Sequence, residues 1–249
     1  LFLSLSFLIT DIILEEIISK SFSLFSSSSS VSESEGNQSI VTNTPNSATS
    51  AVADLEVACL GDRAITLPEL RANVRSHLRD HDFFRKGDIV IVMAGSDDIH
   101  MAEEAPEDVD KFVYASAQLP DLLEKYHSLL SALFEAEEQS LQLKIVLSTG
   151  FLSGERFDGR NSHDELFEEF SGAMKRMAEE LGLQVLDTRQ YLLSNLEELN
   201  IDNFPSSVLT YDGFHFNDLG HVVVAKQLAN WLGLPTAGLD QQIQSHIDR

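Results

Sequence analysis

The sequence predicts a three-layer α/β/α domain with a parallel sheet, and two observations support this prediction. Short apolar segments with β-branched residues alternate with longer segments in which apolar residues repeat at helical spacing. Strands that alternate with helices form right-handed βαβ units, which place the strands parallel to one another. One strand segment, residues 88–94, is a continuous apolar run, which is typical of a strand covered by helices on both faces.

The first half of the domain contains two predicted strands and two predicted helices. Residues 55–60 (LEVACL) fit a short buried strand, and residues 68–78 fit a helix because Pro68 suits a first helical turn. Residues 88–94 (DIVIVMA) form a longer apolar run, which indicates a strand covered on both faces. Residues 119–139 repeat apolar side chains at helical spacing and predict the second helix.

The second half repeats this alternation. Residues 143–148 (LKIVLS) predict another buried strand. Ser162 and Glu165 have the spacing of a capping box and predict the start of a helix. A last short strand is expected at residues 183–186, and a final helix at residues 218–231.

The composition changes outside this domain, which we expect to span residues 53–235. Residues 1–20 form an apolar leader, too short and too charged for a confident membrane span, and we expect a truncated secretory signal or a non-native segment. Residues 21–52 are rich in serine and have little apolar surface to offset ordering entropy, which predicts a flexible linker. Residues 236–249 are expected to form a polar tail. The compartment stays open between the secretory pathway and the cytoplasm.

The charge of the chain excludes one class of partner. The chain carries 17 basic and 40 acidic residues, a formal net charge of −23. Nucleic-acid binding needs a basic surface that displaces counterions from phosphates, and no run of Lys and Arg supplies one. The single cysteine, Cys59, excludes an intramolecular disulfide, and Cys and His show no zinc spacing. We therefore expect no nucleic-acid partner, no metal and no cofactor.

The most informative segment is residues 211–221 (YDGFHFNDLGH), immediately before the last predicted helix. Asp212 and His215 stand three positions apart there. This spacing lets a carboxylate hold an imidazole in one tautomer while the other ring nitrogen acts as a general base. The spacing also fits an aspartate that caps a turn beside a surface histidine, so the pattern alone leaves both interpretations open.

Two further segments follow predicted strands, at the sheet edge where functional groups of α/β proteins collect. Residues 94–99 (AGSDDI) place polar residues after a strand, and residues 57–66 (VACLGDRAIT) run into a turn whose N–H groups suit an oxyanion. Each segment also fits an ordinary turn. His100 beside Asp97 and Asp98 suggests a metal site as an alternative.

Together the three segments resemble the SGNH/GDSL hydrolase superfamily over about residues 55–232. The strongest part is DGFHFNDLGH, which is similar to the family's last block down to Asn217, Gly220 and His221. The resemblance implies a flavodoxin-like fold with Asn217 as structural support. It also implies hydrolysis of a small or carbohydrate-linked acyl ester by a Ser-His-Asp mechanism without a metal.

The resemblance assigns roles to individual residues. His215 would be the general base, and Asp212 would orient it. The Ala64 backbone N–H would be one oxyanion donor, and Asp97 stands where the family has an asparagine that is another. An ionised carboxylate accepts hydrogen bonds but cannot donate one, so the oxyanion hole is degenerate. Asp98 would be a structural acid that ties the loop.

No serine nucleophile can be identified. The family opens with a strand followed by Gly-Asp-Ser, and upstream of residue 55 this chain has only the leader and the linker. The nearest match is residues 7–13 (FLITDII), with Ile12 where the serine should stand. The first strand is therefore expected to be missing or degenerate. Residues 61–63 (GDR) are rejected because the spacing to the next block would be too short by one βα unit.

Three hypotheses remain open. In the first, the protein is an active esterase and this sequence lacks its first block. In the second, the chain is a pseudoenzyme that binds a ligand or partner in the former active-site cleft. The absence of the serine together with the replacement of asparagine by Asp97 favours this hypothesis. In the third, the resemblance is misleading and the chain is another α/β protein, with Asp97, Asp98 and His100 as metal ligands.

Overall fold

The computed structural model describes residues 3–9, 55–59, 65–80, 84–95, 98–99, 111–136, 141–149, 152–158, 161 and 164–248. The strands are β1 (Leu3–Ile9), β2 (Leu55–Cys59), β3 (Ile89–Met93), β4 (Lys144–Ser148) and β5 (Gln184–Leu186). The helices are α2 (Leu67–Asp80), α4 (Lys111–Ala136), α5 (Asp164–Leu181), α6 (Thr188–Leu199), α7 (Asp218–Leu232) and α8 (Ala237–Ile247).

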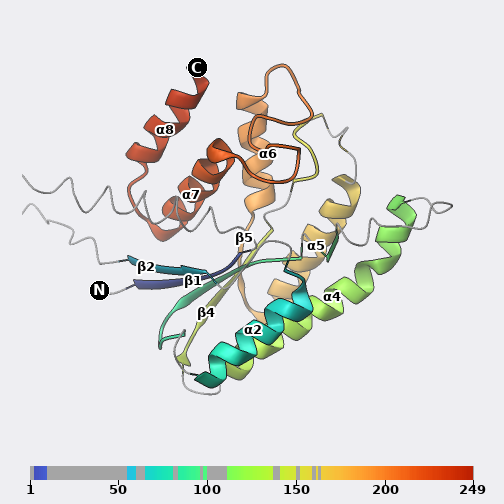
Figure 1. Ribbon diagram of the computed structural model, residues 1–249, viewed down its shortest axis with the longest axis vertical. Helices are drawn as coiled ribbons and strands as arrows, with labels where there is room; N and C mark the ends of the chain where they lie inside the picture. The colour runs from blue at the N-terminus through green and yellow to red at the C-terminus, as the bar shows by residue number, and fades with distance from the viewer. Residues whose placement is uncertain are drawn as a thin grey trace, which may run out of the picture.

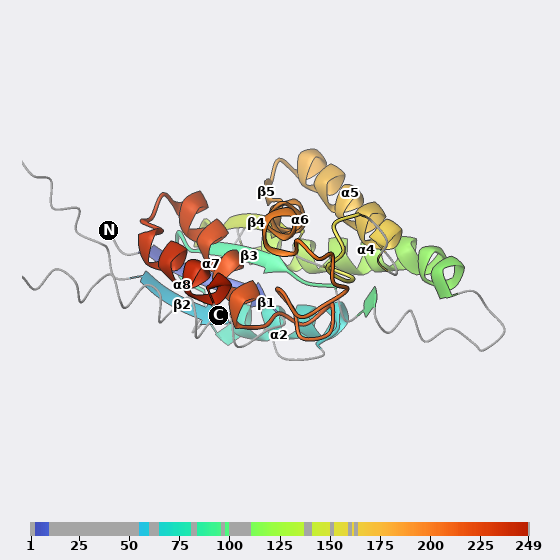
Figure 2. The ribbon, with the colours of Figure 1, turned by 90° about the horizontal axis from the view of Figure 1, so that it is seen from above.

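The five strands form one parallel sheet in the order β2-β1-β3-β4-β5. Helices lie on both sides of it. Figure 1 shows α2, α4 and α5 on one side of the sheet and α7 and α8 on the other, with α6 beside α7. In Figure 2, α4 and α5 again lie together, away from α7 and α8. The predicted three-layer α/β/α fold with a parallel sheet is therefore confirmed.

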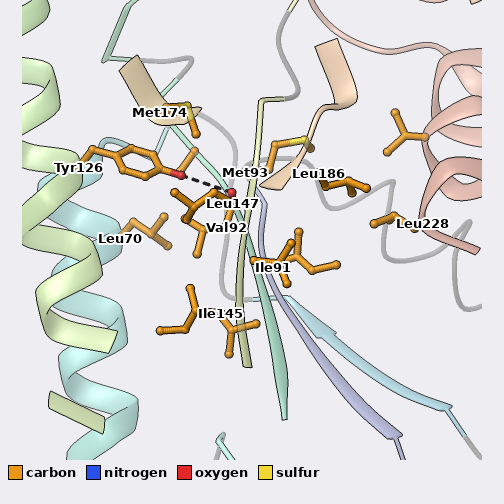
Figure 3. Packing of buried hydrophobic residues seen from close by; sticks show 14 of the residues in the cluster. Leu70, Ile91, Val92, Met93, Tyr126, Ile145, Leu147, Met174, Leu186 and Leu228 are labelled. Carbon is orange, nitrogen blue, oxygen red and sulfur yellow. Dashed lines mark hydrogen bonds between the residues drawn. The ribbon is translucent and has the colours of Figure 1, made fainter. Parts of the chain in front are cut away.

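The core fills the space between the sheet and the two helical layers. All five residues of β3 are buried, as its continuous apolar sequence predicts. Figure 3 shows Leu70 of α2 and Tyr126 of α4 on one side of the sheet and Leu228 of α7 on the other. The Tyr126 hydroxyl donates a hydrogen bond to the Val92 carbonyl at 3.3 Å, and burial raises the pKa of this tyrosine.

The first strand is present, which corrects the alternative that it is missing. β1 comes from the expected leader and lies between β2 and β3, where Leu5 pairs with Val57 on one side and Ile89 on the other. The folded domain therefore starts before residue 53. The sequence pattern concealed β1 because its apolar residues run directly into a charged segment and a long serine-rich stretch. Residues 10–54, which include the predicted linker, lie outside the described residues.

The C-terminal segment is also corrected. Residues 236–249 were expected to form a polar tail, but most of them form α8, which packs against α7. Leu239 is buried, and Asp240 forms a 2.7 Å ion pair with Lys226 of α7. The partly buried Ile243 packs against the core as well. Two apolar contact residues in a largely polar segment are too few to predict this helix from the sequence. Helix α6 is likewise absent from the elements predicted above.

The remaining predicted elements are confirmed within the residues described. β2, β3, β4 and β5 and helices α2, α5 and α7 lie where the pattern places them, whereas α4 starts earlier than predicted. At the start of α2, the Thr66 backbone N–H and hydroxyl both donate to the Glu69 carboxylate, at 2.9 and 2.7 Å. Ser162 of the predicted capping box lies outside the described residues, and α5 begins at Asp164.

Candidate active site

The strand order places a topological switch point between β1 and β3. From β1 the chain leads to β2 on one side, whereas β3, β4 and β5 follow on the other. Ligands of such sheets bind outside the carboxyl ends of the strands at this point. Asp98 follows the carboxyl end of β3, and its Oδ2 accepts a hydrogen bond from the Leu67 backbone N–H at 2.7 Å. This contact ties the segment after β3 to the first residue of α2.

The loop before α7 brings Asp212 and His215 into direct contact. His215 Nδ1 lies 2.8 Å from Asp212 Oδ2. The second oxygen, Oδ1, accepts the backbone N–H groups of Phe214 at 3.0 Å and His215 at 2.8 Å. Because an ionised carboxylate only accepts hydrogen bonds, Nδ1 carries the proton and the lone pair of a neutral ring lies on Nε2. This is the arrangement that a general base requires.

The environment of Asp212 keeps its carboxylate ionised. Partial burial by itself would raise the pKa of Asp212. The hydrogen bonds from the His215 side chain and from the backbones of His215 and Phe214 outweigh that effect, so the pKa of Asp212 lies below its ordinary value. A negative charge is therefore available to stabilise an imidazolium on His215.

The imidazole itself is accessible. The side chain of His215 is 66% exposed and that of Asp212 53% exposed. The Phe214 ring lies edge-on to the imidazole, with ring centroids 5.1 Å apart. The centroid of the Phe214 ring also lies 6.3 Å from that of Phe167 in α5. The Tyr211 N–H donates to the His215 carbonyl at 2.8 Å and closes the turn. The ring is thus presented to solvent on a loop that is anchored to the domain.

The residues after His215 anchor this loop to α7. Asn217 is the N-cap of α7, where its Oδ1 accepts the Gly220 N–H at 3.0 Å and its Nδ2 donates to the Val208 carbonyl at 3.0 Å. The buried His221 has its Nδ1 2.8 Å from the Asn217 carbonyl, to which it donates. The strongest sequence block therefore joins one helix end to the loop that carries His215.

Glu155 contacts the candidate site, and the sequence pattern does not reveal this contact. It lies after β4, is fully buried, and accepts hydrogen bonds from the segment immediately before Asp212. A glutamate in an irregular segment usually lies at the surface, so nothing in the local pattern indicates this burial. The one sequence signal is its position shortly after a buried strand, at the edge of the sheet where functional groups collect.

Several predicted site residues lie outside the described residues. These are Ala64 and Asp97, the two positions assigned to the oxyanion hole, and His100 of the alternative metal site. Their roles remain predictions. The roles of Asp212, His215, Asp98 and Asn217 in catalysis or support are proposals as well.

Comparison with models of protein families identifies the family of this chain. A family model described as the GDSL-like Lipase/Acylhydrolase family matches residues 30–223. The chain belongs to this family. The resemblance derived from the sequence is thereby confirmed, and the hypothesis of an unrelated α/β protein is wrong because the match spans most of the domain. Comparison with curated proteins gives no match.

Solved structures with the same fold include esterases. The acetyl xylan esterase AlAXEase has a TM-score of 0.65 at 15% identity, with 92% of this chain and 100% of that chain covered. A variant of Axe2, an acetyl xylan esterase from Geobacillus stearothermophilus, has a TM-score of 0.60 at 16% identity, with 94% of each chain covered. LAE5, an α/β hydrolase from the metagenome of Lake Arreo, has a TM-score of 0.54 at 14% identity, with 93% of this chain and 94% of that chain covered. In the part of the chain that the structure describes, no helix is suited to crossing a bilayer.

Proposed function

We propose that this domain hydrolyses a small or carbohydrate-linked acyl ester. The observation that carries the proposal is the 2.8 Å contact between His215 Nδ1 and Asp212 Oδ2 on an anchored, exposed loop of a GDSL-family domain. The acetyl xylan esterases among the similar structures support a carbohydrate-linked acetyl group as the substrate.

The chemistry follows from the protonation of the pair. Nε2 of neutral His215 would take the proton of a nucleophilic hydroxyl as that oxygen attacks the ester carbonyl. The imidazolium so formed would be stabilised by Asp212 and would return the proton to the leaving alcohol. The carbonyl oxygen would become an oxyanion, for which the Ala64 N–H is the proposed donor. Water would then release the acyl group by the same steps.

The second candidate is a binding domain of the same fold that lacks catalysis. β1 ends at Ile9, so Thr10, Asp11 and Ile12 follow it in the sequence where the family has Gly-Asp-Ser. An isoleucine offers no nucleophile. The replacement of the oxyanion asparagine by Asp97 is a second, separate departure. These two replacements favour ligand binding at this site without turnover.

A fluorophosphonate that traps activated serines separates the two candidates. Wild-type protein, His215→Ala and the control His127→Ala, an exposed histidine of α4, would be treated and read by intact mass and peptide mapping. Hydrolase activity predicts one adduct that is lost only in His215→Ala, and the mapped peptide identifies the nucleophile. No adduct on folded wild-type protein would overturn the hydrolase proposal. Calorimetric titration with acetylated xylo-oligosaccharide would then test the binding candidate.

A further inference from the structure

Glu155 carries a buried charge that is satisfied by one segment of the chain. Its side chain is fully buried. Oε2 accepts the Val208 N–H at 2.6 Å, and Oε1 accepts the Leu209 N–H at 2.7 Å, the Thr210 N–H, and the Thr210 hydroxyl at 2.6 Å. A buried carboxylate is strongly unfavourable unless donors surround it. The three successive N–H groups therefore depend on Glu155 as much as Glu155 depends on them.

The Thr210 hydroxyl extends this contact into the turn that carries the acid-base pair. Because the carboxylate can only accept, the hydroxyl donates a hydrogen bond to Glu155. Its lone pair is thereby turned toward the Gly213 N–H, which it accepts at 2.8 Å. Gly213 lies between Asp212 and His215 in the chain. The direction of the hydroxyl, and with it the Gly213 contact, follows from the ionisation of Glu155.

The backbone around Glu155 holds the same turn from a second side. The Gly154 N–H donates to the Gly213 carbonyl at 2.6 Å, and the Glu155 N–H donates to the Pro205 carbonyl at 3.0 Å. Gly213 has a φ of +94°, and a Cβ there would lie 3.2 Å from Gly154 Cα. The two segments thus approach as closely as glycine allows. The Gly213 N–H is therefore bound by the Thr210 hydroxyl, and the Gly213 carbonyl is bound by the Gly154 N–H.

We propose that Glu155 is the positioning residue of the Asp212–His215 pair, acting through its negative charge and the Thr210 hydroxyl. The inference rests on the proposed function in one respect, that this pair is the acid-base pair. An ionised carboxylate accepts all four donors, whereas a glutamine of the same shape turns an NH2 group toward backbone N–H groups. Loss of the charge therefore frees the turn and allows the His215 ring to leave Asp212.

The test reads the His215 ring and the loop amides instead of turnover. Glu155→Gln is compared with wild-type protein by ¹H–¹⁵N NMR of the imidazole nitrogens and by hydrogen exchange. We expect the Nδ1–H tautomer of His215 to give way to a mixture that resembles that of Asp212→Asn. We also expect exchange of the Val208, Leu209 and Thr210 amides to become about tenfold faster or more.

A second pair of variants keeps the test decisive if Glu155→Gln does not fold. Thr210→Val removes the hydroxyl link, and Thr188→Val is its matched control, because Thr188 is equally buried and its hydroxyl lies 2.8 Å from that of Ser148. Thr210→Val is expected to change the His215 tautomer, and Thr188→Val to leave it unchanged. The proposal is overturned if Glu155→Gln or Thr210→Val lowers the melting temperature but leaves the His215 signals as in wild-type protein. Since no readout uses an ester, absence of hydrolysis would count only against the proposed function.

Discussion

Gly220 of α7 lies against the backbone carbonyl of Leu209, so closely that a Cβ on Gly220 would collide with that oxygen. The approach occurs in the first turn of α7, where the Gly220 N–H also binds the Asn217 side chain. Leu209 itself is one of the residues held by Glu155. The glycine in the family's last block therefore lets a helix dock directly on the loop that leads to His215.

Gly220→Ala is expected to destabilise the domain by about 3 kcal/mol, because backbone and not a flexible side chain must move. The measurement is the free energy of unfolding from urea titration. Gly172→Ala is the control, since Gly172 is also helical and its added Cβ would meet only the Arg176 side chain, at 3.5 Å. That change should be neutral or stabilise by up to about 1 kcal/mol. Equal effects of the two substitutions would contradict the packing argument.

The hydrogen bonds of Asp212 should make stability depend on acid pH. Its pKa in the folded protein lies below the ordinary value of 3.8, so its stabilising contribution is present above that value and is lost as the pH falls through the folded pKa. Wild-type protein should therefore melt at a higher temperature than Asp212→Asn near neutrality. The difference should shrink below about pH 4. A difference that stays constant through acid pH would rule out this origin.

Arg189 of α6 is buried against α5 and should contribute more than a surface ion pair. Its guanidinium donates to Asp164 at 2.9 Å, with 5% and 16% of the two side chains exposed. Arg189→Met leaves this carboxylate without its main cation and is expected to cost about 3 kcal/mol. Lys125→Met removes an exposed partner of Asp121, 2.8 Å away, and should cost below about 1 kcal/mol. Chemical denaturation of both variants checks the contrast.

Helix α8 is predicted to be an integral part of the domain. Leu239 is 1% exposed, whereas Ile247 at the other end of the helix is 52% exposed. Leu239→Ala should destabilise the protein by about 2 kcal/mol or more, and Ile247→Ala by less than about 0.5 kcal/mol. Thermal unfolding followed by circular dichroism would show this. If both variants melted like the wild type, α8 would be shown to contribute little to stability.

Most of the sheet and the Asp212–His215 contact of the candidate site could be predicted from the sequence. Strands β3 and β4 are apolar along nearly their whole length, and α5 repeats Phe167, Phe170 and Met174 on one face. Such patterns are local, because burial imposes its period on consecutive residues. The contact between Asp212 and His215 can be predicted for the same reason, since the two residues share one short loop and their contact needs no distant partner.

Other features were decided only by the tertiary structure. β1 becomes a central strand because β2 and β3 flank it, and no local property of an apolar segment near the N-terminus specifies those neighbours. Helix α8 is held by Leu239, the partly buried Ile243 and an ion pair to α7, and two apolar contacts in a polar segment do not predict a packed helix. Glu155 lies more than fifty positions before the amides that satisfy it. A buried charge is permitted only by donors that folding brings to it, so its place in the site is fixed by contacts distant in the chain and not by the residues around it.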